Sequence, residues 1–542
     1  MKRKLSAILL AAALALSVTA CDGLGVQYGE EERSDTTYLY INTYDGGYRT
    51  EYLETVARVV EEEYKEKSYA DGKKGLVVKV EAAIGNSGSS LKANMANSTF
   101  NIHVVEALHP MQYVTDGLLA DITDIVKGEV AAGEGMVEDK LFDDQKTALG
   151  KDGKYYALPT FAGFTGLSYN AKLFADRNYY FADAAYVPES VSSYTGKTYT
   201  GRGFVSSAAD KRSPGSDGVY NTEDDGLPSS YEEFFYLLDQ MSDDTVTPII
   251  WSGANMHYTN YLFQALLSAA CTRTELATNF TFDSGNETVD VVRSIAADGT
   301  PATEAVKITN DNGYEMSQQV QRYQALKFLE KLFTEKKGAD PKYFSTRSEG
   351  GGLSNQQAQR VFLEGNFTGE KIAMLIDGNY WYNEAENTRK SLIGTYSDEA
   401  ENMNVRYMTL PWKETGTVDE NEGNPLTIGD TMYYYMVVNN NISGNAEKME
   451  AAKDFIRTFY RASSLQAATV ASGIPMAVKY DLPQAQYDRM DNYAQSLWNV
   501  YKTAKDGNRY VTTESSNATF QAGSDRFAYR TTGKFFNTTV NG

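Results

Sequence analysis

Acidic and aromatic side chains follow several apolar runs of this sequence, where predicted strands would end. Tyr44 and Asp45 come after the run at 37–41, Glu106 follows the run at 100–105, and Asp430 stands just before another apolar run. Carboxylates accept hydrogen bonds from pairs of hydroxyl groups, and flat rings cover apolar C–H faces. This combination suits a polyhydroxylated ring such as a sugar. Capping of neighbouring helices is the alternative role of Asp45 and Glu106.

The aromatic content agrees with such a ligand. The chain holds 39 Tyr, 23 Phe and 4 Trp, a balance typical of surfaces that are both apolar and wet. Trp251 and Trp412 each follow a short apolar run and are candidates for ring contacts, although a lone Trp is more often part of a core. Tyr433 belongs to a run of three tyrosines that we interpret as structural, with Tyr433 or Tyr435 facing the ligand because neighbours in a strand alternate.

Other chemistries are disfavoured by the residues that they require. The three histidines, at 103, 109 and 257, lack metal-site spacing to another His or Cys, and no Gly-x-Ser-x-Gly motif accompanies them. Of the two cysteines, Cys271 lies in an apolar run and is predicted to be a buried, inert thiol. A net charge of −21 argues against nucleic acid as a partner, because phosphate binding needs clustered Lys and Arg.

One acidic loop has a pattern that suits calcium. Ser213, Asp217, Val219, Asn221 and Asp224 occupy spacings that match an EF-hand-like loop around the Asp217-Gly218 turn. The first ligand position holds Ser instead of Asp. The sequence therefore leaves two interpretations open, a structural calcium site and a solvated acidic turn that precedes the helix starting after Ser230.

The first 35 residues read as an export signal and a tether. Lys2, Arg3 and Lys4 precede an apolar run at 5–16, and small residues follow before Cys21. This order predicts a secretory signal at 1–20. The residues around Cys21 resemble the lipobox of bacterial lipoproteins, in which the thiol is diacylated and two acyl chains hold the protein to the membrane. Ordinary signal cleavage, with Cys21 incidental, is the alternative. The Gly-rich and acidic stretch to residue 35 suits a flexible tether.

Strand and helix patterns alternate after the tether. Runs at 37–41, 76–80 and 100–105 read as strands, with helical spacing between them, and helical patterns return at 231–241, 258–271, 318–335 and 446–460. Such alternation predicts an α/β fold with parallel sheets and crossover helices. The stretch at 186–230 is rich in Ser, Gly, Asp, Tyr and Thr and predicts a long loop.

Several sequence fragments stand in a particular order and spacing along the chain, at 116–122, 155–159 with 167–174, 362–365 with 372–381, 451–456 and 472–476. Together they resemble the extracellular solute-binding proteins of ABC importers, in the group that captures oligosaccharides. This resemblance implies the periplasmic-binding-protein-like fold, with two α/β lobes, each a largely parallel sheet flanked by helices, joined by a hinge of crossing strands. It implies lobe 1 at 36–160 and 426–475, and lobe 2 at 161–425 (with the insertion 186–230) and 476–542.

The resemblance also implies function and further site residues. Trp381 and Tyr382 occupy the position where the family often stacks a sugar on an aromatic ring, and Phe161 and Phe164 lie in the segment that crosses between lobes. The expected protein is a monomeric, non-enzymatic lipoprotein on the outer face of a bacterial membrane. It would capture an oligosaccharide between its lobes and deliver it to a permease.

Other classes of protein remain open at this point. A peptide-binding lipoprotein would need buried partners for peptide termini. A secreted glycoside hydrolase would need two carboxylates about 5 to 10 Å apart, which a chain with 72 acidic residues cannot exclude. An adhesion or scaffold protein is disfavoured because we find no internal repeat.

Overall fold

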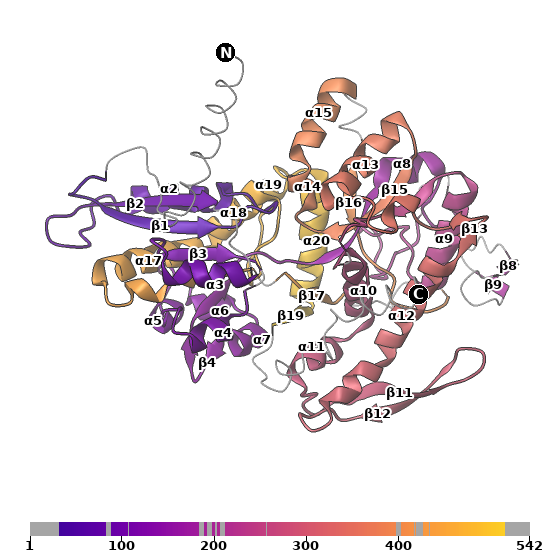
Figure 1. Cartoon of the computed structure of the whole chain (residues 1–542), viewed down its shortest axis with the longest axis horizontal. Coiled ribbons are helices and arrows are strands. Elements are labelled where there is room, and N and C mark those ends of the chain that lie inside the picture. Colours follow the sequence, from indigo (N-terminus) through magenta and orange to yellow (C-terminus); the bar gives the residue numbers. More distant parts are fainter. Residues whose placement is uncertain are drawn as a thin grey trace, which may run out of the picture.

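The computed structural model divides into two lobes that lie side by side (Figure 1). It describes residues 32–82, 88–106, 108–183, 189–191, 198–200, 203–205, 212–255, 257–396, 403–416, 418, 426–432 and 434–514. The predicted signal, Cys21, most of the tether and Tyr433 lie outside these residues. Among the described residues, no helix combines the length and apolar character that crossing a bilayer requires.

Lobe 1 is built on a five-stranded sheet. Its strands lie in the order β2 (Leu76–Ala82), β1 (Thr37–Thr43), β3 (Ile102–Val105), β18 (Tyr435–Val438) and β6 (Ala157–Pro159). All seven residues of β1 are buried, as expected for a central strand covered on both faces. Neighbouring side chains of β18 point to opposite faces of the sheet, so they show what covers each face. Met436 and Val438 join the core formed with α2 (Glu51–Glu63), and Tyr435 and Val437 join a second core with α3 (Gly88–Ala96).

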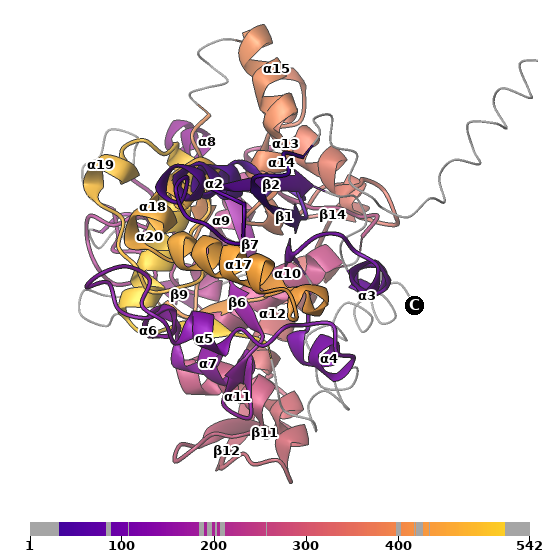
Figure 2. The same cartoon turned by 90° about the vertical axis from the view of Figure 1, so that its left-hand side faces the viewer.

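Helices from distant parts of the chain complete lobe 1. α17 (Ala446–Phe459) and α18 (Ala462–Ser472) pack against α2, although about 400 residues separate them in sequence. In Figure 2, which faces this lobe, the orange helix α17 lies below the indigo strands β1 and β2. The lobe is therefore assembled from both ends of the described chain.

Lobe 2 is built on a four-stranded sheet in the order β10 (Thr247–Ile250), β15 (Ile372–Gly378), β7 (Thr165–Asn170) and β16 (Val405–Met408). Its larger helices are α9 (Tyr231–Asp243), α10 (His257–Ala270), α12 (Val320–Thr334), α13 (Asn355–Thr368) and α20 (Asn492–Asp506). Helix α9 begins where expected, because the Ser230 hydroxyl accepts a hydrogen bond from the Glu233 N–H at 3.2 Å. The predicted two-lobe α/β fold is confirmed.

Each sheet contains one reversed strand, and the reversal has a geometric cause. β18 is antiparallel to both β3 and β6, and β7 is antiparallel to both β15 and β16. The other strands of each sheet share one direction. β7 and β18 are the strands that directly follow a crossing from the other lobe. A crossing segment reaches its new sheet at the edge facing the other lobe, so the strand that it begins runs against strands that end there.

The crossing segments hydrogen-bond to one another and form the hinge. The Thr160 N–H donates to the Tyr434 carbonyl at 3.1 Å, and the Ala162 N–H donates to the Pro475 carbonyl at 2.9 Å. The Thr431 N–H donates to the Gly163 carbonyl at 2.8 Å. Beside them, β17 (Ile428–Asp430) pairs in parallel with β19 (Tyr510–Thr512) near the C-terminal end of the described chain. The expected hinge of crossing strands is thus observed.

The remaining elements are short or lie at the periphery. The stretch expected as a long loop contains a small antiparallel pair, β8 (Glu189–Val191) with β9 (Thr198–Thr200). A longer hairpin, β11 (Val289–Ile295) with β12 (Pro301–Val306), projects from lobe 2 (Figure 1). The other elements are α4 (Pro110–Thr115), α5 (Thr123–Val126), α6 (Val137–Lys140), α7 (Asp143–Ala148), β4 (Gly150–Lys151), β5 (Lys154–Tyr155), α8 (Ala171–Arg177), α11 (Arg273–Thr281), η1 (Gly313–Gln318), β13 (Lys336–Lys337), β14 (Asp340–Pro341), η2 (Thr346–Ser348), α14 (Trp381–Glu384), α15 (Glu386–Tyr396), η3 (Asn440–Ile442) and α19 (Gln484–Tyr487).

Candidate ligand-binding site

Lobe 1 contributes polar groups from the ends of two adjacent strands. Tyr44 and Asp45 follow β1, and Glu106 follows β3, which pairs with β1 in parallel. The Tyr44 N–H donates to the Val104 carbonyl at 3.2 Å, which holds the two strand ends together. Tyr44 and Glu106 are half-buried and Asp45 is exposed. The carboxyl ends of parallel strands are the usual position of ligand-binding groups in α/β sheets.

Lobe 2 contributes a carboxylate pair held by one glutamine. Asp377 lies in β15, one residue before its end, and Glu384 closes α14. The Gln359 side chain, from α13, donates from Nε2 to Asp377 Oδ2 at 3.1 Å and to Glu384 Oε2 at 2.8 Å. The Gly378 N–H donates to Asp377 Oδ1 at 2.7 Å. Asp377 is buried, whereas Glu384 retains partial exposure. Gln359 therefore holds both carboxylates in place, and Glu384 keeps a solvent-exposed side.

Tyrosines from both lobes meet next to these acids. The ring of Tyr48, after β1, lies 5.4 Å from the ring of Tyr380 between centroids. The Tyr380 hydroxyl lies 3.3 Å from the Tyr261 hydroxyl, and the Tyr261 ring lies tilted against the Tyr258 ring, one helical turn away in α10, with centroids 4.9 Å apart. We call the set from both lobes the acid–tyrosine cluster: Tyr44, Tyr48, Glu106, Tyr258, Tyr261, Asp377, Tyr380 and Glu384.

The backbone approaches closely where the lobes touch. Gly47 has a φ of +87°, and a Cβ placed on it would lie 2.7 Å from both the Glu384 Cγ and the Tyr380 carbonyl oxygen. Only glycine allows this contact without displacement. Two residues further, Arg49 pairs with Glu386 of lobe 2 at 3.0 Å. The loop after β1 is therefore a direct contact between the lobes.

The acids of the cluster are electrostatically linked across the lobes. Burial, and then the charge of Glu384, raises the pKa of Glu106 to about 7. Burial also raises the pKa of Glu384, and burial followed by the Glu384 charge raises the pKa of Asp377 well above its ordinary value. Burial and then the Glu106 charge raise the pKa of Tyr44. These groups thus lie close enough to oppose one another's ionisation.

Several buried polar atoms beside the cluster have no hydrogen-bond partner among the described residues. They are the Tyr48 hydroxyl, Gln359 Oε1 and Asn379 Oδ1. Tyr48 is fully buried, and its pKa is raised by burial and then by Glu106. Buried polar atoms are normally paired. Their concentration at this contact between lobes is a feature of a polar binding site.

The aromatic candidates lie mostly in the cores. Trp381 is fully buried, donates from Nε1 to Ser168 Oγ at 2.8 Å, and meets Phe362 edge-on. Trp251 is 3 % exposed and packs against Phe344 with centroids 4.7 Å apart. Both side chains were expected at the ligand. In this structure both indoles are buried and neither presents a free face.

The two phenylalanines of the crossing segment are also packed from all sides. Phe161 is fully buried and stacks on Tyr48 with centroids 4.7 Å apart. Phe164 is 2 % exposed and meets Tyr407 edge-on. In this structure they pack within the hinge beneath the cluster and present no free face.

The remaining candidates lie apart from the cluster or behind it. Tyr382 is half-buried, with the Arg389 guanidinium 3.8 Å above its ring. Trp412 is half-buried on lobe 2 and donates from Nε1 to the Ser216 carbonyl at 2.9 Å. Asp430 is buried in the hinge, where the Tyr510 hydroxyl donates to its Oδ2 at 2.8 Å and burial raises its pKa to about 7. Tyr433 lies outside the described residues.

The acidic loop is closed by its own hydrogen bonds. Asp224 Oδ2 accepts from the N–H groups of Ser216 at 2.7 Å and Asp217 at 3.0 Å, and the Val219 N–H donates to Asp217 Oδ1 at 2.7 Å. Burial, and then the Asp224 charge, raises the pKa of Asp217 to about 7. Ser213 is buried and Asn221 is exposed with a φ of +64°. In the described parts of the chain, no three His, Cys, Asp or Glu side chains gather as a metal site.

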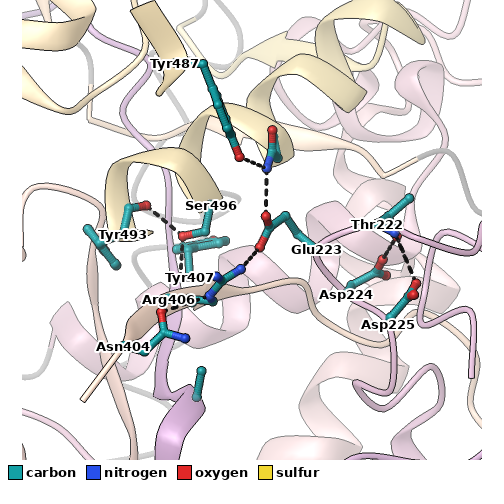
Figure 3. A network of polar contacts seen from close by, with 12 residues as sticks. Thr222, Glu223, Asp224, Asp225, Asn404, Arg406, Tyr407, Tyr487, Tyr493 and Ser496 are labelled. Atoms are coloured by element: carbon teal, nitrogen blue, oxygen red, sulfur yellow. Dashed lines mark hydrogen bonds and ion pairs between the residues drawn. The ribbon is translucent and has the colours of Figure 1, made fainter. Parts of the chain in front are cut away.

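The same loop connects to the C-terminal helix through Glu223 (Figure 3). Glu223 pairs with Arg406 of β16, and the Asn499 side chain of α20 donates to Glu223 Oε1 at 3.0 Å and to the Tyr487 hydroxyl at 2.9 Å. A cavity of about 400 Å³ lies on one side of this network, lined by Thr222, Glu223, Tyr487, Asn499 and Lys502 among others. The network fastens the loop to lobe 2.

Sequence reasoning missed most members of the cluster. Asp377 directly follows an apolar run at 372–376 and Tyr380 stands three residues later, so the rule that selected Glu106 applies to this stretch as well. Tyr258 and Tyr261 have the i, i+3 spacing of one helix face. Glu384 carries no such signal, because only the contact between lobes brings it to Glu106.

The chain is similar to several known proteins. A family model described as bacterial extracellular solute-binding protein matches residues 62–495. Among solved structures, a chitin oligosaccharide binding protein is 20 % identical, with 89 % of each chain covered and a TM-score of 0.48. Apo RafE from Streptococcus pneumoniae is 14 % identical, with 94 % of this chain and 99 % of that chain covered and a TM-score of 0.50. No protein with a curated description matches.

The family match covers far more than half of the chain, including strands of both lobes and the crossing segments between them. The chain therefore belongs to the bacterial extracellular solute-binding proteins.

Proposed function

We propose that this protein captures an oligosaccharide at the acid–tyrosine cluster and delivers it to the permease of an ABC importer. The observation that carries the proposal is the cluster itself. Two lobes joined by a hinge each supply acids and tyrosines to one partly exposed place, so a ligand there would contact both lobes at once and favour their approach.

The side chains of the cluster suit sugar hydroxyls. Glu106 and Glu384 retain exposed surface, and ionised carboxylates accept up to four hydrogen bonds each. Tyr44 and Tyr261 are half-buried, and each offers an aromatic body together with a hydroxyl that donates and accepts. The buried Tyr48 hydroxyl and Asn379 Oδ1 lack partners in the described chain. Polar atoms of this kind fix the orientation of a ligand.

We further propose that the protein acts without chemical turnover and on the outer face of a membrane. Family membership supports an extracytoplasmic place of action. The lipobox-like pattern at the start of the chain supports anchoring through a diacylated Cys21. We also propose that the protein acts as a monomer. Growth of the bacterial host with labelled palmitate tests the anchor directly. The wild-type protein should incorporate the label, and the Cys21→Ala variant should not.

We also propose that the loop at 213–224 holds a structural calcium ion through Asp217 and Asp224. The half-buried Asp217 and the buried Asp224 form no ion pair with a basic side chain of the described chain, and the Asp224 charge raises the pKa of Asp217, so a cation between them would relieve this repulsion. When bound, calcium would tie the loop together by oxygen ligands. A midpoint of thermal unfolding that is lower in chelator than in calcium, with the difference lost in Asp217→Asn, would support this proposal.

The function is tested by thermal-shift titration of residues 22–542 with neutral oligosaccharides, monosaccharides and short peptides. A ligand that binds only the folded state raises the unfolding midpoint as its concentration increases. We expect a saturable rise with an oligosaccharide that chromatography recovers intact. Cleavage of the glycan would indicate a hydrolase, and shifts with peptides alone would indicate a peptide-binding protein.

A further inference from the structure

The charges around the acid–tyrosine cluster are of one sign. Glu106 and Asp45 face it from lobe 1, and Asp377 and Glu384 face it from lobe 2. Within the described residues, none of these four carboxylates forms an ion pair with a Lys, Arg or His side chain. The neighbouring base, Arg49, pairs with Glu386, whose carboxylate also binds Lys390 at 2.7 Å.

Several buried or half-buried acids elsewhere in this protein are paired with a base. Asp454 binds Lys67 at 2.6 Å, Glu447 binds Lys73 at 2.6 Å, and Asp144 binds Arg273 at 2.8 Å. Glu223 binds Arg406 in the network of Figure 3. The cluster departs from this pattern, because its donor to Asp377 and Glu384 is the neutral side chain of Gln359.

Unpaired acids at a binding site constrain the ligand. A sugar hydroxyl donates to a carboxylate and replaces water there, whereas a ligand carboxylate or sulfate would meet like charges from two lobes without a compensating base. Like charges placed together across an interface cost several kcal/mol. The effect strengthens as the lobes approach, because Glu106 and Glu384 belong to different lobes.

We propose that this site, which rests on the sugar-binding function proposed above, takes glycans with uncharged or amino-bearing units and rejects glycans with uronic acid or sulfated units, with Glu106 and Glu384 as the residues that discriminate. An acidic glycan is then expected to bind at least about 100-fold more weakly than a neutral glycan of the same backbone. Glycans bearing a free amine stay within the accepted class, because an amine brings no negative charge to the cluster.

The test is calorimetric titration at pH 8 with matched tetrasaccharides. The probes are neutral tetramers of glucose, galactose, xylose and N-acetylglucosamine, the glucosamine tetramer, and tetramers carrying glucuronic or galacturonic acid on the same backbones. We expect a neutral tetramer to bind and its uronate counterpart to give no saturable heat. Binding of the uronate within tenfold of the neutral tetramer would overturn the proposal.

A variant assigns the discrimination to the cluster. In Glu384→Gln, which keeps the side-chain shape, the ratio of neutral to uronate affinity is expected to fall at least tenfold, and in Glu287→Gln, an exposed acid of lobe 2, the ratio stays unchanged. An unchanged ratio in a Glu384→Gln protein with a cooperative unfolding transition would refute this assignment. If no tetrasaccharide of any charge binds, the sugar-binding function fails first, which separates that result from a failure of charge selection.

Discussion

Replacing Gly47 with alanine should weaken ligand binding by blocking the contact between lobes. Gly47 has a φ of +87°, and an added Cβ would lie 2.7 Å from the Tyr380 carbonyl oxygen and the Glu384 Cγ. The carbonyl oxygen belongs to the backbone and cannot rotate away, so the loop and α14 must separate by several tenths of an ångström.

Two costs can be separated in this variant. A left-handed φ costs an alanine about 1 to 2 kcal/mol of folding free energy, because its Cβ crowds the backbone. The steric overlap costs roughly a further 1 to 3 kcal/mol, as in other overpacked sites. The second cost is paid only when the lobes are in contact. It should therefore reduce ligand affinity by about 5- to 150-fold.

Gly72 provides the matched control. Its φ is +77°, and a Cβ placed on it would have no neighbour within 4 Å. Gly72→Ala should lower the unfolding midpoint through the same backbone strain and leave ligand affinity within twofold of wild type. Calorimetric titration and thermal unfolding of both variants give the two quantities. Equal affinities in Gly47→Ala and Gly72→Ala would refute the reasoning that the ligand requires this contact.

Four further outcomes follow from the geometry. The pKa of Glu106 is about 7 in the folded chain, against an ordinary value of 4.5, so the free energy of unfolding falls as pH rises from 4.5 to 7. Glu106→Gln should therefore raise the unfolding midpoint at pH 8 and not at pH 4. An equal effect at both pH values would contradict the raised pKa. Trp381→Phe should cost about 1 to 3 kcal/mol in urea unfolding by removing a buried hydrogen bond, with ligand affinity unchanged; a tenfold loss of affinity would restore a stacking role. Glu223→Gln should cost about 1 kcal/mol by breaking the half-buried pair with Arg406, with a smaller loss in 1 M salt, and a cost that salt leaves unchanged would argue against a charge effect. Asp217→Asn should abolish the chelator-dependent part of the unfolding midpoint; a midpoint that chelator does not change in the wild type would exclude structural calcium in the loop.

The fold was predictable because its signals are local and repeated. The strand run at 37–41 lies within β1, and the helical run from 446 matches α17, since each depends on burial patterns within one element. The reversed direction of β7 and β18 was not read from the sequence. It follows from the crossing between lobes, which no local pattern encodes.

Of the candidate site, only residues that follow the strands of lobe 1 were predicted from the sequence. Tyr44 and Glu106 follow strands, and the structure places both in the cluster. Trp381 was selected because large aromatics suit sugar rings, yet the side chain three residues away, Glu384, faces the other lobe while Trp381 packs inward. The face of α14 on which each side chain lies determines which of the two reaches the other lobe. That face depends on tertiary packing, which the type of residue does not reveal.

The central claim is that a ligand binds between the lobes at the acid–tyrosine cluster. Calorimetric titration of the best neutral oligosaccharide from the screen into wild type, Glu106→Gln and Glu287→Gln tests it most directly. We expect one site per chain, an affinity at least about tenfold weaker in Glu106→Gln, where a charged acceptor is lost, and no change in Glu287→Gln. Full affinity in a folded Glu106→Gln protein would contradict the claim and place the ligand elsewhere.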